Sequence, residues 1–103
     1  PTSNEDDLNP VVATTLKGNI PNPFNPSTTI LYDILLPCPV KLDIYNARGQ
    51  KVRTLINEWK ASGHHSVVWN GRDDKGRATS SGLYFYRFSA GDYSSTRKML
   101  LME

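Results

Sequence analysis

Short stretches in which apolar and polar residues alternate constrain the fold of this chain more than any other feature. The clearest runs cover residues 28–36 and 40–45. Side chains at every second position of a β-strand share one face, so each run predicts a strand with one buried face. Similar runs recur along the chain with turn signals about every 8–12 residues, and no helical periodicity persists. The pattern predicts an all-β chain folded as an antiparallel β-sandwich of about seven strands.

The alternation also predicts which side chains face the core. The expected inward residues are Ile30, Tyr32, Ile34, Leu36, Val40, Leu42, Ile44, His65, Val67, Trp69, Tyr84, Tyr86, Phe88, Met99 and Leu101. Lys41, Asp43 and Tyr45 are expected to point largely outward. The odd spacing of Val52 and Leu55 predicts a bulge near Thr54. A short edge strand is expected over residues 12–17, ended by Gly18 and Asn19.

The segment "NPFNPSTTI", residues 22–30, has the most unusual local chemistry in the sequence. Its prolines fix their own φ angles and keep the preceding residues out of the helical region. Phe24 lies between the two asparagines, which can cap local turns with their side chains. We expect Phe24 to pin this segment to the core, and a recognition surface is the alternative.

A length of 103 residues suits one small domain. Residues 1–10 are polar and acidic, and we expect residues 1–15 to form a linker or disordered segment before a sandwich domain over 16–103. The chain begins with Pro1 and shows no signal peptide, so we expect a piece of a longer protein whose targeting signal lies elsewhere.

Charge and composition exclude several classes of partner. A formal net charge of +2, with scattered basic residues, gives no basic stripe for nucleic acid. No apolar run approaches the ~18 residues of a membrane helix, so no membrane insertion is expected. Cys38 is the single cysteine and can form no internal disulfide. It is most simply a small buried hydrophobe, with an intermolecular disulfide left open.

Residue types with catalytic chemistry do not form a set. His64 and His65 are adjacent, so on a strand they face opposite sides, His65 inward and His64 toward solvent. Asp73 and Asp74 lie in a polar turn, where capping of backbone amides is favoured over a calcium site. We therefore predict no catalytic residue, no cofactor and no metal, and expect that the chain is not an enzyme.

Aromatic residues leave one binding alternative open. Trp59 and Trp69, with five tyrosines, are compatible with a sugar-stacking platform. Ordinary sandwich core is the favoured interpretation, because Trp69 falls on an inward face.

Three stretches in a fixed order carry a family resemblance. They are "NPFNPSTTI", "VKLDIYNARGQKVRTL" and the run from "SGHHSVVWNGRDDKG" to the end. Together they resemble the C-terminal Ig-like module of type A sorting domains in the type IX secretion system. They are also similar to the Ig-like domain of flagellar hook-capping proteins. The resemblance covers about residues 16–103 and implies an Ig-like sandwich.

The resemblance implies a non-catalytic module that addresses a larger exported cargo protein to an outer-membrane translocon. Its partners would be that secretion machinery and an N-terminal cargo domain of the same polypeptide. The location would be secreted or cell-surface, reached through the periplasm. Residues 81–88 match the family's Ser-Gly-x-Tyr strand. Asn70 departs from the aspartate usual after Trp69, and Glu103 departs from the usual basic terminal residue.

The last strand is the expected recognition element. A strand at a sheet edge has unpaired backbone groups, to which a receptor can add a strand of its own. The recognition candidates are Gly91, Asp92, Arg97, Lys98, Met99, Leu100, Leu101 and Glu103. The alternatives are that this strand only closes the sandwich, or that the chain is a structural, adhesive or carbohydrate-binding Ig-like module of a multidomain extracellular protein.

Overall fold

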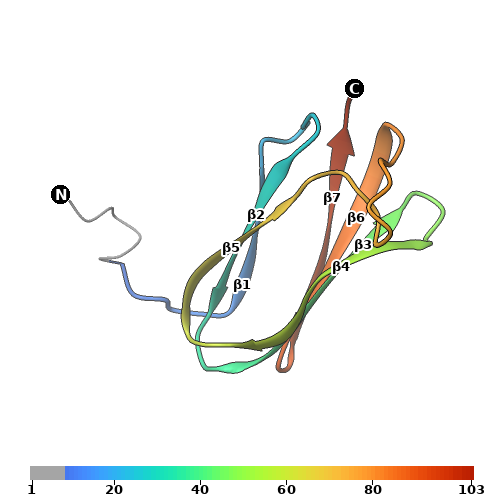
Figure 1. The fold of residues 1–103 in the computed structure, drawn as a ribbon. Coiled ribbons are helices and arrows are strands. Elements are labelled where there is room, and N and C mark those ends of the chain that lie inside the picture. Colours follow the sequence, from blue (N-terminus) through green and yellow to red (C-terminus); the bar gives the residue numbers. More distant parts are fainter. Residues whose placement is uncertain (1–8) are drawn as a thin grey trace.

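A computed structural model describes residues 9–103 and confirms the all-β sandwich (Figure 1). Its seven strands are β1 (Thr15–Ile20), β2 (Thr28–Ile34), β3 (Cys38–Asn46), β4 (Lys51–Lys60), β5 (Gly63–Trp69), β6 (Gly82–Ala90) and β7 (Tyr93–Leu101). All pairings between them are antiparallel. Residues 9–103 contain no helix with the length and apolar character that a membrane crossing requires.

The strands form two packed sheets. One sheet has the order β1-β2-β5 and the other has the order β4-β3-β6-β7. In Figure 1 the three-stranded sheet stands on one side and the four-stranded sheet on the other, with the chain crossing between them at the β2–β3, β4–β5 and β5–β6 connections. The outer strands of the larger sheet are therefore β4 and β7.

The core lies between the two sheets and is filled by alternate side chains from both. The largest fully buried side chains are Trp69, Tyr32, Tyr86 and Phe88. Three of these rings pack against other aromatic rings: Trp69 lies 5.2 Å from Tyr84, and Tyr32 lies 5.1 Å from Phe88, between ring centroids. The inward positions predicted on β3, β6 and β7 are confirmed.

Three strand boundaries differ from the sequence-based expectation. β1 begins at Thr15 instead of residue 12. β1 does not end at Gly18, because a bulge between Leu16 and Gly18 lets pairing with β2 continue to Ile20. β2 ends at Ile34, so Leu36 lies in a turn with 70% of its surface exposed instead of in the core.

Strand β4 contains two irregularities where one was predicted. The register against β3 shifts between Leu42 and Asp43 and again between Ile44 and Tyr45. Leu55 and Val52 are the unpaired residues at these shifts, which explains their odd spacing. Asp43 is also not exposed: only 7% of its surface is accessible, and its carboxylate accepts a hydrogen bond from the Thr54 hydroxyl at 2.7 Å.

The proline-rich segment is anchored as predicted. Phe24 is 2% exposed and packs against Trp69 with 5.7 Å between ring centroids. Its backbone also pairs in parallel with Leu101 at the end of β7. The segment therefore connects the start of the first long strand to the end of the last one.

Candidate functional site

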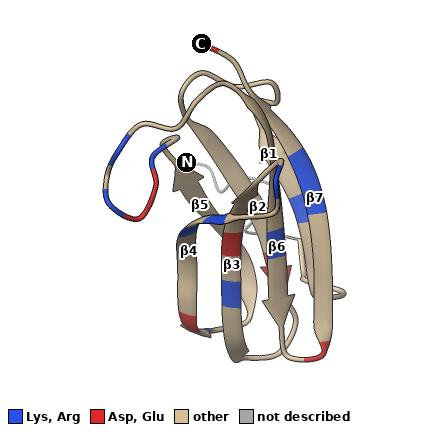
Figure 2. Cartoon of the chain, turned by 90° about the vertical axis from the view of Figure 1, so that its right-hand side faces the viewer, with Lys and Arg blue, Asp and Glu red and all other residues tan. Residues whose placement is uncertain are grey.

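The predicted recognition strand, β7, is an outer strand of the four-stranded sheet. It pairs with β6 over its whole length, from Tyr93 to Leu101. No other strand of residues 9–103 pairs with its opposite side. Figure 2 shows the basic residues of β7 side by side on this edge of the sandwich.

The geometry of the β6–β7 hairpin determines which backbone groups of β7 form no hydrogen bond to β6. Two residues, Gly91 and Asp92, connect β6 to β7, and Ala90 pairs with Tyr93. Gly91 has a φ of 58°, which suits glycine at the first central position of a two-residue hairpin turn. In an antiparallel pair, residues alternate between exchanging both backbone bonds with the partner and pointing them away. The backbone N–H and C=O groups of Ser94, Thr96, Lys98 and Leu100 consequently point away from β6.

The C-terminal part of this edge is closed by the proline-rich segment. The Leu100 N–H donates to the Asn22 side-chain oxygen at 3.0 Å, and the Leu100 carbonyl accepts from the Phe24 N–H at 3.0 Å. The Met102 N–H then donates to the Phe24 carbonyl at 2.9 Å. Leu100 is therefore not available for strand addition, contrary to the sequence-based expectation. The open part of the edge is Ser94 to Lys98.

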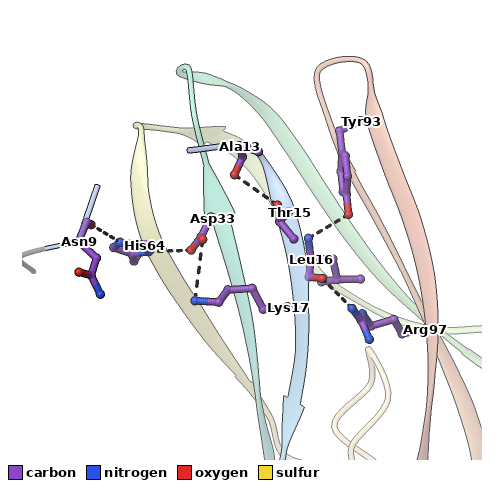
Figure 3. Close-up of polar contacts among 9 residues, drawn as sticks. All are labelled: Asn9, Ala13, Thr15, Leu16, Lys17, Asp33, His64, Tyr93 and Arg97. Atoms are coloured by element: carbon purple, nitrogen blue, oxygen red, sulfur yellow. Dashed lines mark hydrogen bonds and ion pairs between the residues drawn. The ribbon is translucent and has the colours of Figure 1, made fainter. Parts of the chain in front are cut away.

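Two side chains of β7 tie this edge to β1 on the facing sheet. The Leu16 N–H donates to the Tyr93 hydroxyl at 3.1 Å, and Arg97 donates to the Leu16 carbonyl at 3.1 Å (Figure 3). These two bonds join the β7 edge to the β1 edge, and we call this contact between the sheets the seam. Arg97 is therefore partly engaged in the seam. Lys98 lies on the outer face beside Phe85, and its ammonium has no carboxylate partner within residues 9–103.

An open groove of about 630 Å³ runs between β1 and β7. Lys17, Asn19 and Ile20 line it from β1, and Thr96, Arg97 and Lys98 line it from β7. At its floor the Tyr86 hydroxyl donates to the Asn19 side-chain oxygen at 3.0 Å. Burial raises the pKa of Tyr86 to about 12, although the nearby Arg97 opposes the shift. The groove thus combines unpaired backbone groups with three cationic side chains.

The remaining recognition candidates do not gather at one point. Gly91 and Asp92 lie in the turn at one end of β7, and exposed Glu103 lies beyond the other end. A nine-residue strand separates these ends by roughly 27–30 Å. Met99 and Leu101 are buried in the core, so their side chains are not presented for recognition.

The Asp73–Asp74 loop is a folded turn, as predicted. Asp73 accepts hydrogen bonds from the backbone N–H groups of Lys75 and Arg77, both at 2.9 Å. These bonds hold the pKa of the Asp73 carboxyl below its ordinary value, and the bond from the Arg77 backbone N–H contributes most. Asp74 accepts from the Thr54 N–H at 3.1 Å, and its own N–H donates to the Val52 carbonyl at 3.1 Å. The loop therefore covers part of the outer edge of β4.

The two histidines face opposite sides of β5, as predicted. His65 is half-buried and stacks on Tyr32, with 5.1 Å between ring centroids. His64 is not simply solvent-facing: its Nδ1 lies 2.8 Å from Asp33 Oδ1, and its Nε2 lies 2.8 Å from the Asn9 carbonyl oxygen (Figure 3). In the described part of the chain no group of three or more His, Cys, Asp or Glu side chains comes together as metal ligands would.

The aromatic platform imagined for a sugar does not form. Trp69 is completely buried, and its indole N–H donates to the Arg72 carbonyl at 2.9 Å. Trp59 is 65% exposed on β4, where it pairs with Pro39. The two tryptophans therefore cannot stack on one ligand.

Sequence reasoning did not identify the residues that close or tie the β7 edge. Asn22 was expected to cap a local turn, yet its side chain reaches Leu100, 78 positions away. Tyr93 was given no function, yet it bonds to Leu16 across the sandwich. A long-range partner leaves no signal in local spacing. The one available clue was the density of prolines beside Asn22, which leaves backbone groups needing partners elsewhere.

The domain boundary proposed from the sequence stays a prediction. Residues 1–8 of the expected linker lie outside the described residues. The following residues contact the sandwich, because the Thr14 hydroxyl accepts a hydrogen bond from the Leu35 N–H at 3.0 Å. β1 then begins at Thr15, one position before the proposed domain start.

Solved structures with the same fold come from bacterial secretion and flagellar proteins. Latent PorU from Porphyromonas gingivalis superposes with a TM-score of 0.68 at 19% identity, over 82% of this chain and 9% of that one. PorZ from the same organism, described as an essential surface component of the type-IX secretion system, gives 0.56 at 21% identity, over 82% and 11%. FlgD from Xanthomonas campestris, whose structure is linked to the hook capping essential for flagellar assembly, gives 0.59 at 20% identity, over 85% and 64%.

The chain spans less than two thirds of the length of each of these structures, and about a tenth of the first two. A comparison with curated protein sequences found no match. The Ig-like domain of FlgD matches residues 38–94, which are more than half of the chain and include β3 to β6. The chain therefore belongs to the family of FlgD Ig-like domains.

Proposed function

We propose that this Ig-like domain is a non-catalytic sorting module that addresses a larger exported protein to an outer-membrane translocon. The observation that carries the proposal is the open edge of the last strand, β7. β7 lies at an outer edge, leaves the backbone groups of Ser94, Thr96 and Lys98 without a backbone partner within residues 9–103, and bears adjacent Arg97 and Lys98. Such an edge is what a receptor needs for recognition by strand addition.

A comparison of the β7 edge with the residues considered for catalysis or metal binding supports a role in recognition. The side chains of Asp73, Asp74 and His65 are engaged in fixed hydrogen bonds or ring stacking. The β7 edge, in contrast, offers unpaired groups and an ammonium at Lys98. The occurrence of the same fold in PorU and PorZ, where it makes up about a tenth of each chain, supports an accessory module within a larger exported protein.

Export of a reporter tests this proposal. The 103-residue chain is fused behind a reporter enzyme with a signal peptide and expressed in a bacterium with type IX secretion machinery. We expect the reporter outside the cell, and expect it in the periplasm when the module is removed or the translocon is deleted. Reporter that stays in the periplasm with the intact module would refute the sorting function.

The terminal charge provides a second arm of the same test. Glu103 stands where the resembling sorting domains commonly end on a basic residue. If the translocon reads positive charge near the end of β7, Glu103→Lys should raise the exported fraction, whereas Asp92→Lys in the turn at the far end should not.

The second candidate function is a structural or adhesive Ig-like module of an extracellular protein. The family match with FlgD favours it, and so does Trp59, whose exposed ring beside Pro39 can stack on a sugar. Screening of soluble glycans by tryptophan fluorescence tests this, since Trp69 is buried and Trp59 alone can respond at the surface. A response lost in Trp59→Phe, together with failed reporter export, would favour adhesion over sorting.

A further inference from the structure

The two halves of the β7 edge differ in their free backbone groups. Between the hairpin turn and the proline-rich segment, Ser94, Thr96 and Lys98 present outward N–H and C=O groups without a backbone partner in the described chain. Beyond Lys98, Asn22 and Phe24 occupy the corresponding groups. The open stretch therefore has a defined length of five residues, or about 14 Å at the rise of an antiparallel strand.

The charge around this stretch is positive on both faces. Lys98 projects on the outer face of the sheet and also borders the groove, and Arg97 and Lys17 line the groove on the side that faces β1. Among residues 9–103, the one carboxylate paired with these cations is that of Asp33, 3.8 Å from the Lys17 ammonium. An added strand would therefore place either set of alternate side chains beside a cation.

We propose that residues 94–98 of β7 accept a short, extended, acidic segment of a partner protein as an additional strand. This inference rests on the proposed function in treating β7 as the recognised strand, and it specifies the stretch and the chemistry of the partner. Main-chain hydrogen bonds to Ser94, Thr96 and Lys98 supply the binding. Acidic side chains opposite Lys98 and Arg97 supply the selectivity.

A second copy of the same chain is a poorer occupant of this edge. Two β7 strands paired edge to edge would bring the Arg97–Lys98 pairs of both copies together. Like charges placed opposite each other destabilise a strand pair. The positive edge thus disfavours self-association while favouring an acidic partner, as charged edge strands commonly do in natural sheets.

Titration with synthetic peptides tests the inference without any export machinery. The probes are a capped seven-residue peptide of alternating valine and glutamate, and its counterpart of alternating valine and lysine. Amide NMR signals of the isotope-labelled 103-residue chain are followed at low salt. We expect the acidic peptide to shift the signals of Ser94, Thr96 and Lys98, more weakly as salt is added, and the basic peptide to bind at least tenfold more weakly.

Two substitutions at one position separate backbone pairing from side-chain effects. Thr96→Pro removes an outward N–H and leaves every bond to β6 in place, whereas Thr96→Val keeps that N–H. We expect T96P to bind the acidic peptide about tenfold more weakly than T96V, since one backbone hydrogen bond is lost. Should T96P not fold, Lys98→Glu is compared with Lys51→Glu on β4, and only the change at Lys98 should weaken binding.

Several results would overturn the inference. They are acidic-peptide shifts that do not include β7, equal binding by T96P and T96V in folded protein, and a concentration-dependent dimer through β7 in sedimentation velocity. The proposed function fails separately, when the reporter fused to the unchanged module stays in the periplasm. Export that proceeds equally with T96P and T96V would show that the translocon does not read this edge, whatever the peptides do.

Discussion

The two outer strands of the four-stranded sheet, β4 and β7, treat their free edges in opposite ways. β4 is bent by two bulges, and the loop containing Asp74 covers its edge through bonds to Val52 and Thr54. β7 pairs with β6 without a register shift, and among the described residues only Asn22 and Phe24 cover its free edge, at the C-terminal end. Natural sheets commonly protect their edges with bulges, loops and charge. Of these two outer strands, β7 thus keeps an open stretch from Ser94 to Lys98, and this is where we propose that a partner chain adds.

The largest expected effect comes from removing the anchor that closes the end of β7. Phe24→Ala deletes a buried ring that packs on Trp69, so we expect a loss of about 3–5 kcal/mol in the free energy of unfolding. Urea denaturation measures it. Leu36→Ala, which removes a largely exposed side chain, is the matched control and should change stability little. An unchanged midpoint for F24A would show that the segment does not anchor β7.

A smaller effect is expected at alkaline pH in the seam beside β7. The phenol of Tyr86 holds its proton to about pH 12 in the fold, whereas a tyrosine in the unfolded chain ionises near 10. The stability from this difference is present below pH 10 and is lost as the pH rises from 10 to 12, by about 2 kcal/mol. Tyr86→Phe should lack that part of the loss in urea titrations. Burial also raises the pKa of Tyr32, which is unchanged in both proteins.

Uncovering the edge of β4 should lower the free energy of unfolding by a smaller amount. Asp74→Ala removes the acceptor of the Thr54 N–H, and we expect a loss of about 1–2 kcal/mol with faster amide exchange at Thr54. Asp74→Asn keeps an oxygen at the same place and should lose less. Equal exchange at Thr54 in all three proteins would mean that the loop does not protect β4.

The smallest expected effect is at the closed end of β7. Asn22→Ala removes the acceptor of the Leu100 N–H and should cost about 1 kcal/mol, because water can replace the lost partner at this exposed bond. Exchange at Leu100 should quicken, and the stretch open to the acidic peptide should lengthen toward the C-terminus. Peptide shifts that still end at Lys98 would show that Phe24 alone limits the site.

Local patterns predicted most of the fold because every second side chain of a strand faces the core and is therefore apolar. Ile30, Tyr86 and Met99 were placed correctly for this reason. Errors arose where long-range pairing overrode local signals. Gly18 was expected to end the first strand, yet a bulge allows β1 to continue beyond it. Asp43 was expected to be exposed, yet a hydrogen bond from the Thr54 hydroxyl allows its burial.

The candidate site was predicted only in outline. The final strand was expected to lie at a sheet edge, but the limits of the open stretch depend on contacts between residues far apart in the sequence. Asn22 meets Leu100, and Leu16 meets Arg97. No local spacing encodes these contacts, so only the folded chain reveals that Ser94 to Lys98 is open.

Amide hydrogen exchange across the two outer strands shows directly whether β7 has an open edge. We expect rapid exchange at Ser94, Thr96 and Lys98, whose N–H groups face solvent, and protection at Thr54, Leu100 and Met102, whose N–H groups have partners. Protection of all six amides to the same degree would mean that β7 has no open edge to offer.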